Sequence, residues 1–245
     1  MRMNIIMDRL DILAFGAHPD DVEIGMGATL AKYASEGFRV GICDLTKAEY
    51  SSNGTVEQRQ KEAKTAGEIL KLTARIQLSL SDRGLKNITE DQLSDVVSVI
   101  RKYKPSIVFT PYQVDRHPDH GACSDIVKEA VFNAGIKRYI CSEKLNAFRP
   151  DDVYFYFING YEHPDFVVDV TNFFETKMRA LQAYESQFIK TVNTVDTPLT
   201  NGYIAVVEAR ERLFGKEAGV TYAEGFKTTK PIVITNLFAG KEQRL

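Results

Sequence analysis

The stretch LDILAFGAHPDD, residues 10–21, decides the fold, because an apolar run ends within it and a polar cluster follows at once. Residues 10–15 are mostly apolar, which predicts a buried strand. His18, Asp20 and Asp21 come directly after it, although a turn needs only one Asp or Gly. We therefore expect a functional site at the carboxyl end of this strand.

Strands and helices alternate through the first half of the chain. Strands are expected at 10–15, 38–43, 75–80 and 106–110, with helices between them at 27–36, 56–70 and 89–100. Short links between alternating elements predict a parallel sheet covered by helices, with right-handed crossovers. The expected fold class is α/β, a Rossmann-like, doubly wound, mostly parallel sheet with helices on both faces.

The second half continues with fewer strong signals. Helices are expected at 121–134, 171–188 and 199–214, and strands at 154–158 and 166–170. No internal repeat or linker divides the sequence, so residues 1–245 are expected to form a single domain, with 1–9 as an N-terminal extension. The apolar tail KPIVITNLFAG, 230–240, suits either a subunit contact or an edge strand.

Composition excludes several classes of protein. A 245-residue chain with 44% hydrophobic residues can bury a sizeable core, and its net charge of −2 offers no basic field for nucleic acid. Cys43, Cys123 and Cys141 are widely spaced and odd in number, which indicates reduced thiols. No segment has the apolar length of a signal peptide or a membrane span. We expect a cytoplasmic protein without a nucleic-acid or membrane partner.

A second polar cluster follows the strand at 106–110. It lies in TPYQVDRHPDHG, residues 110–121, and contains His117, Asp119 and His120. In an open parallel sheet, ligands bind at the carboxyl ends of the strands where the strand order reverses. The first and fourth strands flank that reversal, so the two clusters are expected to meet. Together they hold three of the four histidines.

Two imidazoles and a carboxylate are common ligands of hydrolytic zinc, which lowers the pKa of a bound water towards ~7. A second carboxylate can then accept the proton of that water. The spacing does not decide which of Asp20 and Asp21 would be the ligand, and iron or cobalt would suit the same donors. Each cluster alone is also typical of a turn in which Asp caps a helix. Asp119 either caps the helix from Gly121 or orients a histidine.

Two other features have simpler interpretations. Gly25 and Gly27 open a helix, and Asp44 ends a strand, as in a dinucleotide site, but Leu30 occupies the place of the third glycine. We reject dinucleotide binding and assign the glycines to close packing of helix and strand. His163 lies in another His-Pro-Asp sequence but precedes a strand, and we interpret it as a loop residue.

The stretches AHPDDVEIGMGATLAKY, 17–33, and HPDHGA, 117–122, resemble the two signature motifs of the PIG-L or LmbE-like zinc deacetylases, which act on N-acetylglucosaminyl compounds. Other segments look more specifically like the bacillithiol-pathway branch, whose members deacetylate N-acetyl-glucosaminyl-malate. These segments are ICDLTKAEYSSNGTVEQRQKEA, LSDRGL, AYESQF and YAEGFKT, at 42–63, 80–85, 183–188 and 222–228. The resemblance covers nearly all of the chain beyond residue 9.

The resemblance implies roles for individual residues. One Zn²⁺ per subunit would be bound by His18, Asp21 and His120. Asp20 would be the general base, and His117 would support the charge of the tetrahedral intermediate or assist protonation of the leaving group. Arg59 and Asp82 match the positions that bind the sugar, although each also suits an ordinary surface or turn residue. The branch commonly forms hexamers, which implies a homo-oligomer.

Three further points stay open. A carboxylate on the substrate would need a basic contact, for which Lys47, Arg83 and Arg149 are candidates. Tyr203 would either donate to the oxyanion or serve as a core tyrosine. The function hypothesis is zinc-dependent removal of the acetyl group from N-acetyl-glucosaminyl-L-malate, releasing acetate and a free amine. The alternatives are deacetylation of another small N-acetyl sugar or amide, and sugar binding without catalysis.

Overall fold

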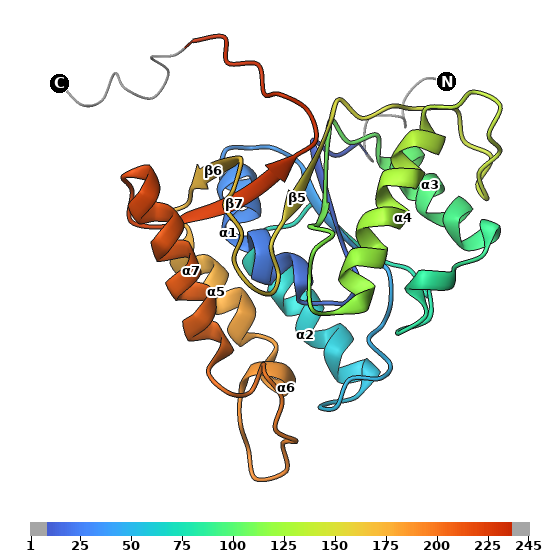
Figure 1. The fold of residues 1–245 in the computed structure, drawn as a ribbon. Helices are drawn as coiled ribbons and strands as arrows, with labels where there is room; N and C mark the ends of the chain where they lie inside the picture. The colour runs from blue at the N-terminus through green and yellow to red at the C-terminus, as the bar shows by residue number, and fades with distance from the viewer. Residues whose placement is uncertain (1–8, 237–245) are drawn as a thin grey trace.

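The protein is described by a computed structural model over residues 9–236 (Figure 1). Its centre is a seven-stranded sheet of order β3-β2-β1-β4-β5-β7-β6. The strands are β1 (Ile12–Gly16), β2 (Val40–Asp44), β3 (Ala74–Gln77), β4 (Ile107–Pro111), β5 (Asp152–Tyr156), β6 (Phe166–Asp169) and β7 (Ala223–Thr228). The expected extension at residues 1–9 lies almost wholly outside the described residues.

Helices cover both faces of the sheet. They are α1 (Asp21–Ser35), α2 (Val56–Ile69), α3 (Glu90–Tyr103), α4 (Pro118–Ala134), α5 (Phe174–Gln182), α6 (Glu185–Phe188) and α7 (Tyr203–Ala218), with a 3₁₀ turn at Leu85–Asn87. Side chains of β1 alternate between two cores. Ile12 and Ala14 pack with α1, α2, α5 and α7, whereas Leu13 and Phe15 pack with α3 and α4. The expected α/β fold class is confirmed. No helix in the described part of the chain is long and apolar enough to span a membrane.

The sheet reverses its order between β1 and β4. β1 pairs in parallel with β2 on one side and with β4 on the other, and β3 and β5 extend the parallel part. The carboxyl ends of β1 and β4 are therefore neighbours, as expected for a doubly wound sheet.

The sequence interpretation missed β7. This strand lies between β5 and β6 and is antiparallel to both. Its sequence AEGFKT lacks apolar alternation, because the buried Glu224 pairs with Lys177 instead of an apolar neighbour. After β7, residues 229–236 form no strand, and Val233 is 84% exposed. The prediction of an edge strand is therefore wrong for that part of the tail, whereas the subunit contact remains a prediction. Residues 237–240 lie outside the described range.

Helix boundaries also differ where the polar motifs lie. α1 begins at Asp21 and α4 at Pro118, each earlier than the apolar pattern predicts. α4 starts inside its His-Pro-Asp motif and α1 starts directly after the other one, so side chains needed for chemistry occupy their first turns. The helix expected at 171–188 is divided into α5 and α6.

Gly25 allows α1 to pack against β5, as the sequence interpretation proposed. A Cβ atom at Gly25 would lie 2.0 Å from Cδ2 of Tyr156, whose hydroxyl donates to the Phe15 carbonyl at 2.7 Å. We expect Gly25→Ala to lower the free energy of unfolding by about 1–3 kcal/mol or more, because neither partner can move freely. Urea denaturation measures the change. Gly27→Ala is the control, since its Cβ would meet Lys177 at an ordinary 3.4 Å. Equal stability of both variants would contradict this packing argument.

Candidate active site

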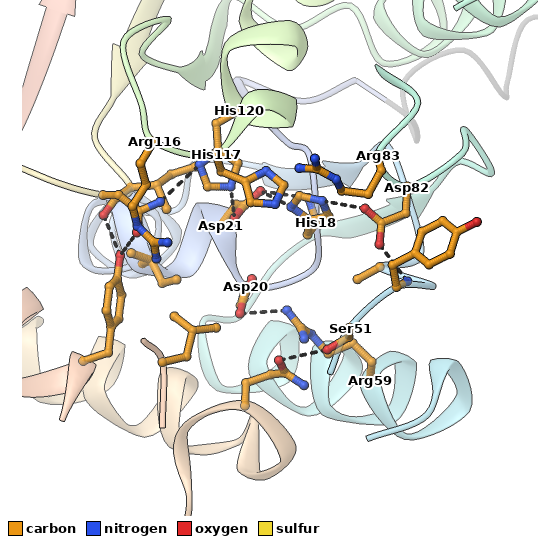
Figure 2. A pocket seen from close by; sticks show the side chains of 18 residues that line it. His18, Asp20, Asp21, Ser51, Arg59, Asp82, Arg83, Arg116, His117 and His120 are labelled. Carbon is orange, nitrogen blue, oxygen red and sulfur yellow. Dashed lines mark hydrogen bonds and ion pairs between the residues drawn. The ribbon is translucent and has the colours of Figure 1, made fainter. Parts of the chain in front are cut away.

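Two polar clusters meet at the carboxyl ends of β1 and β4 (Figure 2). His18 and Asp20 follow β1, whereas His117 and His120 begin α4. The His117 ring centroid lies 4.8 Å from that of His18 and 4.7 Å from that of His120. The expected meeting of the two clusters is confirmed, and a metal bound to both is geometrically feasible.

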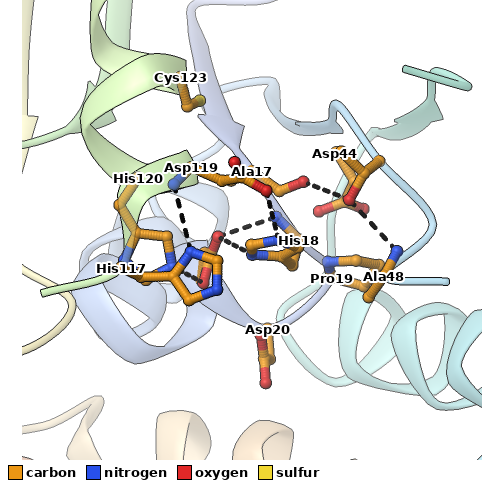
Figure 3. Close-up of polar contacts among 12 residues, drawn as sticks. Ala17, His18, Pro19, Asp20, Asp44, Ala48, His117, Asp119, His120 and Cys123 are labelled. Carbon is orange, nitrogen blue, oxygen red and sulfur yellow. Dashed lines mark hydrogen bonds and ion pairs between the residues drawn. The ribbon is translucent and has the colours of Figure 1, made fainter. Parts of the chain in front are cut away.

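Asp21 lies between His18 and His120, whose rings are neighbours in Figure 3. Its Oδ2 accepts a hydrogen bond from the His18 backbone N–H at 2.8 Å and is 3.3 Å from His18 Nδ1. Its Oδ1 is 3.2 Å from His120 Nε2. Two imidazole nitrogens and one carboxylate therefore converge on a single point of the site.

The opposite nitrogen of each ring faces a second carboxylate. His18 Nε2 is 3.1 Å from Asp82 Oδ1 and 3.6 Å from Asp119 Oδ2. His120 Nδ1 is 2.9 Å from Asp115 Oδ1. Metal-binding histidines generally donate their outer N–H to such a carboxylate, which fixes the tautomer and leaves the inner nitrogen free to bind.

The donor set fits a divalent metal. His18, His117 and His120 each place a ring nitrogen within 4.8 Å of the others, and the carboxylate of Asp21 lies between His18 and His120. Burial alone would lower the pKa of His120, but Asp21 and Asp115 raise it to about 9. Burial would raise the pKa of Asp21, but His120 and His18 hold it well below its usual range. In this buried cluster the negative carboxylates stabilise the positive charge of the protonated imidazoles. A metal cation can take the place of those protons.

Asp20 lies apart from the converging donors and faces Arg59 (Figure 2). Its Oδ2 is 2.7 Å from Arg59 Nη2, and Arg59 Nε donates to the Pro19 carbonyl at 2.8 Å. Burial raises the pKa of Asp20 to about 7 against the opposing charge of Arg59. A carboxylate that titrates near neutral pH suits a general base. The guanidinium of Arg59 holds Asp20 in place, a contact that the sugar-binding prediction did not include.

His117 is the N-cap of α4, so the capping alternative for Asp119 is wrong. His117 Nδ1 accepts from the Asp119 backbone N–H at 3.3 Å, which places the ring proton on Nε2. Burial, together with the charges of His18 and His120, lowers the pKa of His117 to about 4. A neutral His117 can therefore donate a hydrogen bond from Nε2 at neutral pH. Asp119 contacts His18 and accepts from the Arg83 N–H at 2.7 Å, which fits the orienting alternative.

These side chains surround a cleft of about 180 Å³. The sequence-predicted residues that line it are His18, Asp20, Asp21, Arg59, Asp82, Arg83, His117, His120 and Tyr203. The Tyr203 hydroxyl lies 2.9 Å from both the Ile158 carbonyl and Asn159 Oδ1. It is thus a buried tyrosine at the wall of the cleft, with its proton already engaged.

Arg149 is wrong as a residue of this cleft. Its guanidinium lies against Gly135 at the carboxyl end of α4, whereas the cleft is at the amino end. Lys47 does not line the cleft either. The sequence interpretation missed Asp115, Arg116 and Asn159. Two of them stand directly before His117 in VDRHPDH, so their position next to the motif was the available signal.

Comparisons with known proteins identify the family of the chain. The family model PIG-L, described as GlcNAc-PI de-N-acetylase, matches residues 13–131. A diacetylchitobiose deacetylase from Thermococcus kodakarensis is 30% identical over 229 residues, covering 88% of this chain and 82% of that protein. “Probable N-acetyl-alpha-D-glucosaminyl L-malate deacetylase 2” from Bacillus anthracis is 25% identical, covering 82% of this chain and 92% of that protein.

A solved structure extends the likeness to the whole fold. The conserved protein TT1542 from Thermus thermophilus superimposes with a TM-score of 0.85 at 35% identity, covering 93% of this chain and 98% of that one. The family match spans β1 to α4, which carry both polar clusters. The chain therefore belongs to the PIG-L family and is a deacetylase that hydrolyses an amide bond.

Proposed function

We propose that the protein removes the acetyl group from an N-acetylglucosaminyl conjugate with the help of a bound zinc ion. The observation that carries this proposal is the separation of two adjacent carboxylates. Asp21 lies between the ring nitrogens of His18 and His120, whereas Asp20 is turned towards Arg59. One carboxylate is thus available as a ligand and the other as a base.

A zinc ion held by His18, Asp21 and His120 would lower the pKa of a water and polarise the acetyl carbonyl. Asp20 accepts a proton as the water oxygen attacks the carbonyl carbon. The Nε2–H of His117 donates to the carbonyl oxygen as negative charge develops there. Asp20 then returns the proton to the nitrogen as the carbon–nitrogen bond breaks. The products are acetate and a free amine.

The proposed substrate is N-acetyl-glucosaminyl-L-malate. The Bacillus anthracis relative named above supports it, and so do two arginines that line the cleft. Arg83 and Arg116 both line the cleft, beside the histidine cluster (Figure 2). Two guanidinium groups suit the two carboxylates of a malate group, because arginine binds carboxylates in a bidentate manner.

Diacetylchitobiose is the second candidate substrate, because the Thermococcus relative is 30% identical to this chain. A second sugar carries no charge, so it would accept hydrogen bonds from the two arginines but form no ion pair with them. Released acetate, measured on N-acetyl-glucosaminyl-malate, diacetylchitobiose and N-acetylglucosamine with and without chelator, separates the candidates. Acetate release from none of them, or release that survives chelation, would contradict the proposed function.

We expect Arg116→Ala and Arg83→Ala each to raise KM for the malate conjugate by about 10-fold, because each removes one charged hydrogen-bond donor worth about 1.5 kcal/mol or more. The KM for N-acetylglucosamine should stay within about two-fold. Arg212→Ala is the matched control, since Arg212 lies on the exposed surface of α7 and pairs with Glu208. Equal losses on both substrates would show that the arginines do not select the aglycone.

The resemblance also implied an oligomer. The exposed apolar residues of the tail, Ile232, Val233 and Ile234, are consistent with a contact between subunits. A homo-oligomer remains part of the proposal, and sedimentation of the purified protein measures it.

A further inference from the structure

We propose that Asp115 and Asn159 form a clamp that fixes the orientation and tautomer of His120, and that Asn159 thereby sets the metal affinity of the site. Neither residue was singled out by the sequence. The inference rests on the proposed function, because it takes His120 to be a metal ligand. It concerns how the chain prepares that ligand before any substrate binds.

Asp115 contacts both histidines of the second motif. Its Oδ1 is 2.9 Å from His120 Nδ1 and accepts from the His117 backbone N–H at 2.8 Å. The carboxylate side chain is only 3% exposed. A buried carboxylate with a free choice of rotamers could not orient an imidazole, so something must hold Asp115 itself.

Asn159 supplies that restraint from a different part of the sheet, three residues after β5. Its side-chain amide donates to Asp115 Oδ1 at 2.9 Å, and its backbone N–H donates to Asp115 Oδ2 at 3.0 Å. Both carboxylate oxygens are thereby bound by one residue, which fixes the plane of the carboxylate. The Asn159 amide also lies 3.5 Å from His120 Nδ1, so the three side chains form one compact group.

The loop that carries Asn159 is anchored in turn by α7. The Asp115 carboxylate can only accept, so it assigns the amide nitrogen of Asn159 to its own side, and the amide oxygen then lies 2.9 Å from the Tyr203 hydroxyl. Arg210 donates to the Ile158 carbonyl through Nη1 and to the Ile24 carbonyl of α1 through Nη2, both at 2.8 Å. The clamp therefore connects the C-terminal helix to the metal site.

The consequence concerns the ring of His120. Asp115 accepts the proton on Nδ1, so the lone pair is on Nε2, which faces Asp21. Loss of the clamp would release the competing tautomer, with a proton on Nε2, and would free rotation of the ring. In both cases metal binding would first have to restore the correct state, and its affinity would fall.

The test measures zinc affinity by competition with a chromogenic chelator, with no substrate present. We expect Asp115→Asn to weaken zinc binding by about 10–100-fold, and Asn159→Ala to weaken it by about 10-fold. The loss of zinc affinity in the double variant should be smaller than the product of the two single-variant losses, because both substitutions act through His120. Asp165→Asn is the matched control. Asp165 likewise accepts a backbone N–H and an amino group, but it does so beside Thr228 and Lys227 on β7.

A second readout separates positioning from general damage. Nitrogen-15 NMR of the zinc-loaded parent should show His120 protonated on Nδ1. In metal-free protein held above about pH 9, where the His120 ring is neutral, the parent should keep its ring proton on Nδ1 and Asn159→Ala should show a mixture of tautomers, although the unfolding midpoint of the variant is close to that of the parent. Unchanged zinc affinity in Asn159→Ala would overturn the clamp. Unchanged affinity in His120→Ala would instead overturn the proposed metal site, so the two failures are distinguishable.

Discussion

Asp20→Asn is expected to bind zinc as tightly as the parent and to lose about 10²–10⁴-fold in kcat, the range for removal of a general base. The amide keeps the size of the side chain but cannot accept the proton of the attacking water. Asp20 points towards Arg59, away from the point where His18 and His120 converge, so the substitution leaves the metal donors intact.

The choice of asparagine matters at this position. Asp20 has φ of +112°, in the region where asparagine is tolerated better than alanine. Asp20→Ala would add backbone strain to the loss of the base. Asp20→Asn still removes the charge that pairs with the buried Arg59, so the unfolding midpoint must be recorded with the kinetics.

Acetate release and metal content measured on the same preparation check this prediction. Asp125→Asn is the control, because Asp125 is an exposed acid on α4 with no contact to the cleft. Turnover within a few-fold of the parent would remove Asp20 from the mechanism. Loss of zinc together with activity would instead make Asp20 a metal ligand, contrary to the division of roles proposed for the two carboxylates.

The sequence was sufficient to place the site because topology alone brings the carboxyl ends of β1 and β4 together. Apolar periodicity located both strands, and the strand order of a doubly wound sheet predicted that their carboxyl ends are neighbours. The contacts of Asp82 with His18 and of Asp115 with His120 depend instead on side-chain directions in separate loops. A spacing argument carries no information on such directions.

The missed strand β7 has a related cause. Glu224 in this strand accepts hydrogen bonds from the backbone N–H groups of Ala28 and Thr29, two and three residues after Met26 departs from helical geometry within α1. It also pairs with the buried Lys177. A charged residue that would argue against a buried strand is thus satisfied by partners about 50 to 200 residues away in the sequence. A periodic pattern of apolar residues reveals a strand that buries apolar side chains. β7 buries the charged side chain of Glu224 instead, so the pattern is absent.

The second large effect is expected at the metal ligands. His120→Ala and His18→Ala should each weaken zinc binding by more than the roughly 10–100-fold that is typical for loss of an outer partner, because each removes a ligand itself. Activity should fall in proportion to the metal lost. His163→Ala is the matched control, since His163 is the remaining histidine and lies exposed in the loop before β6.

The pH dependence of metal binding gives an independent check on His120. Its pKa is raised to about 9 by Asp21 and Asp115 against the effect of burial, so below that pH zinc must displace a proton from the ring. Zinc affinity of the parent should therefore increase with pH up to at least about 9, because His18, whose pKa Asp21 raises well above its usual range against the effect of burial, must also lose a proton. In His120→Ala this proton is absent, and the slope of affinity against pH should be smaller. An unchanged slope in that variant would mean that zinc never displaces the His120 proton in the parent, and therefore that it binds without His120.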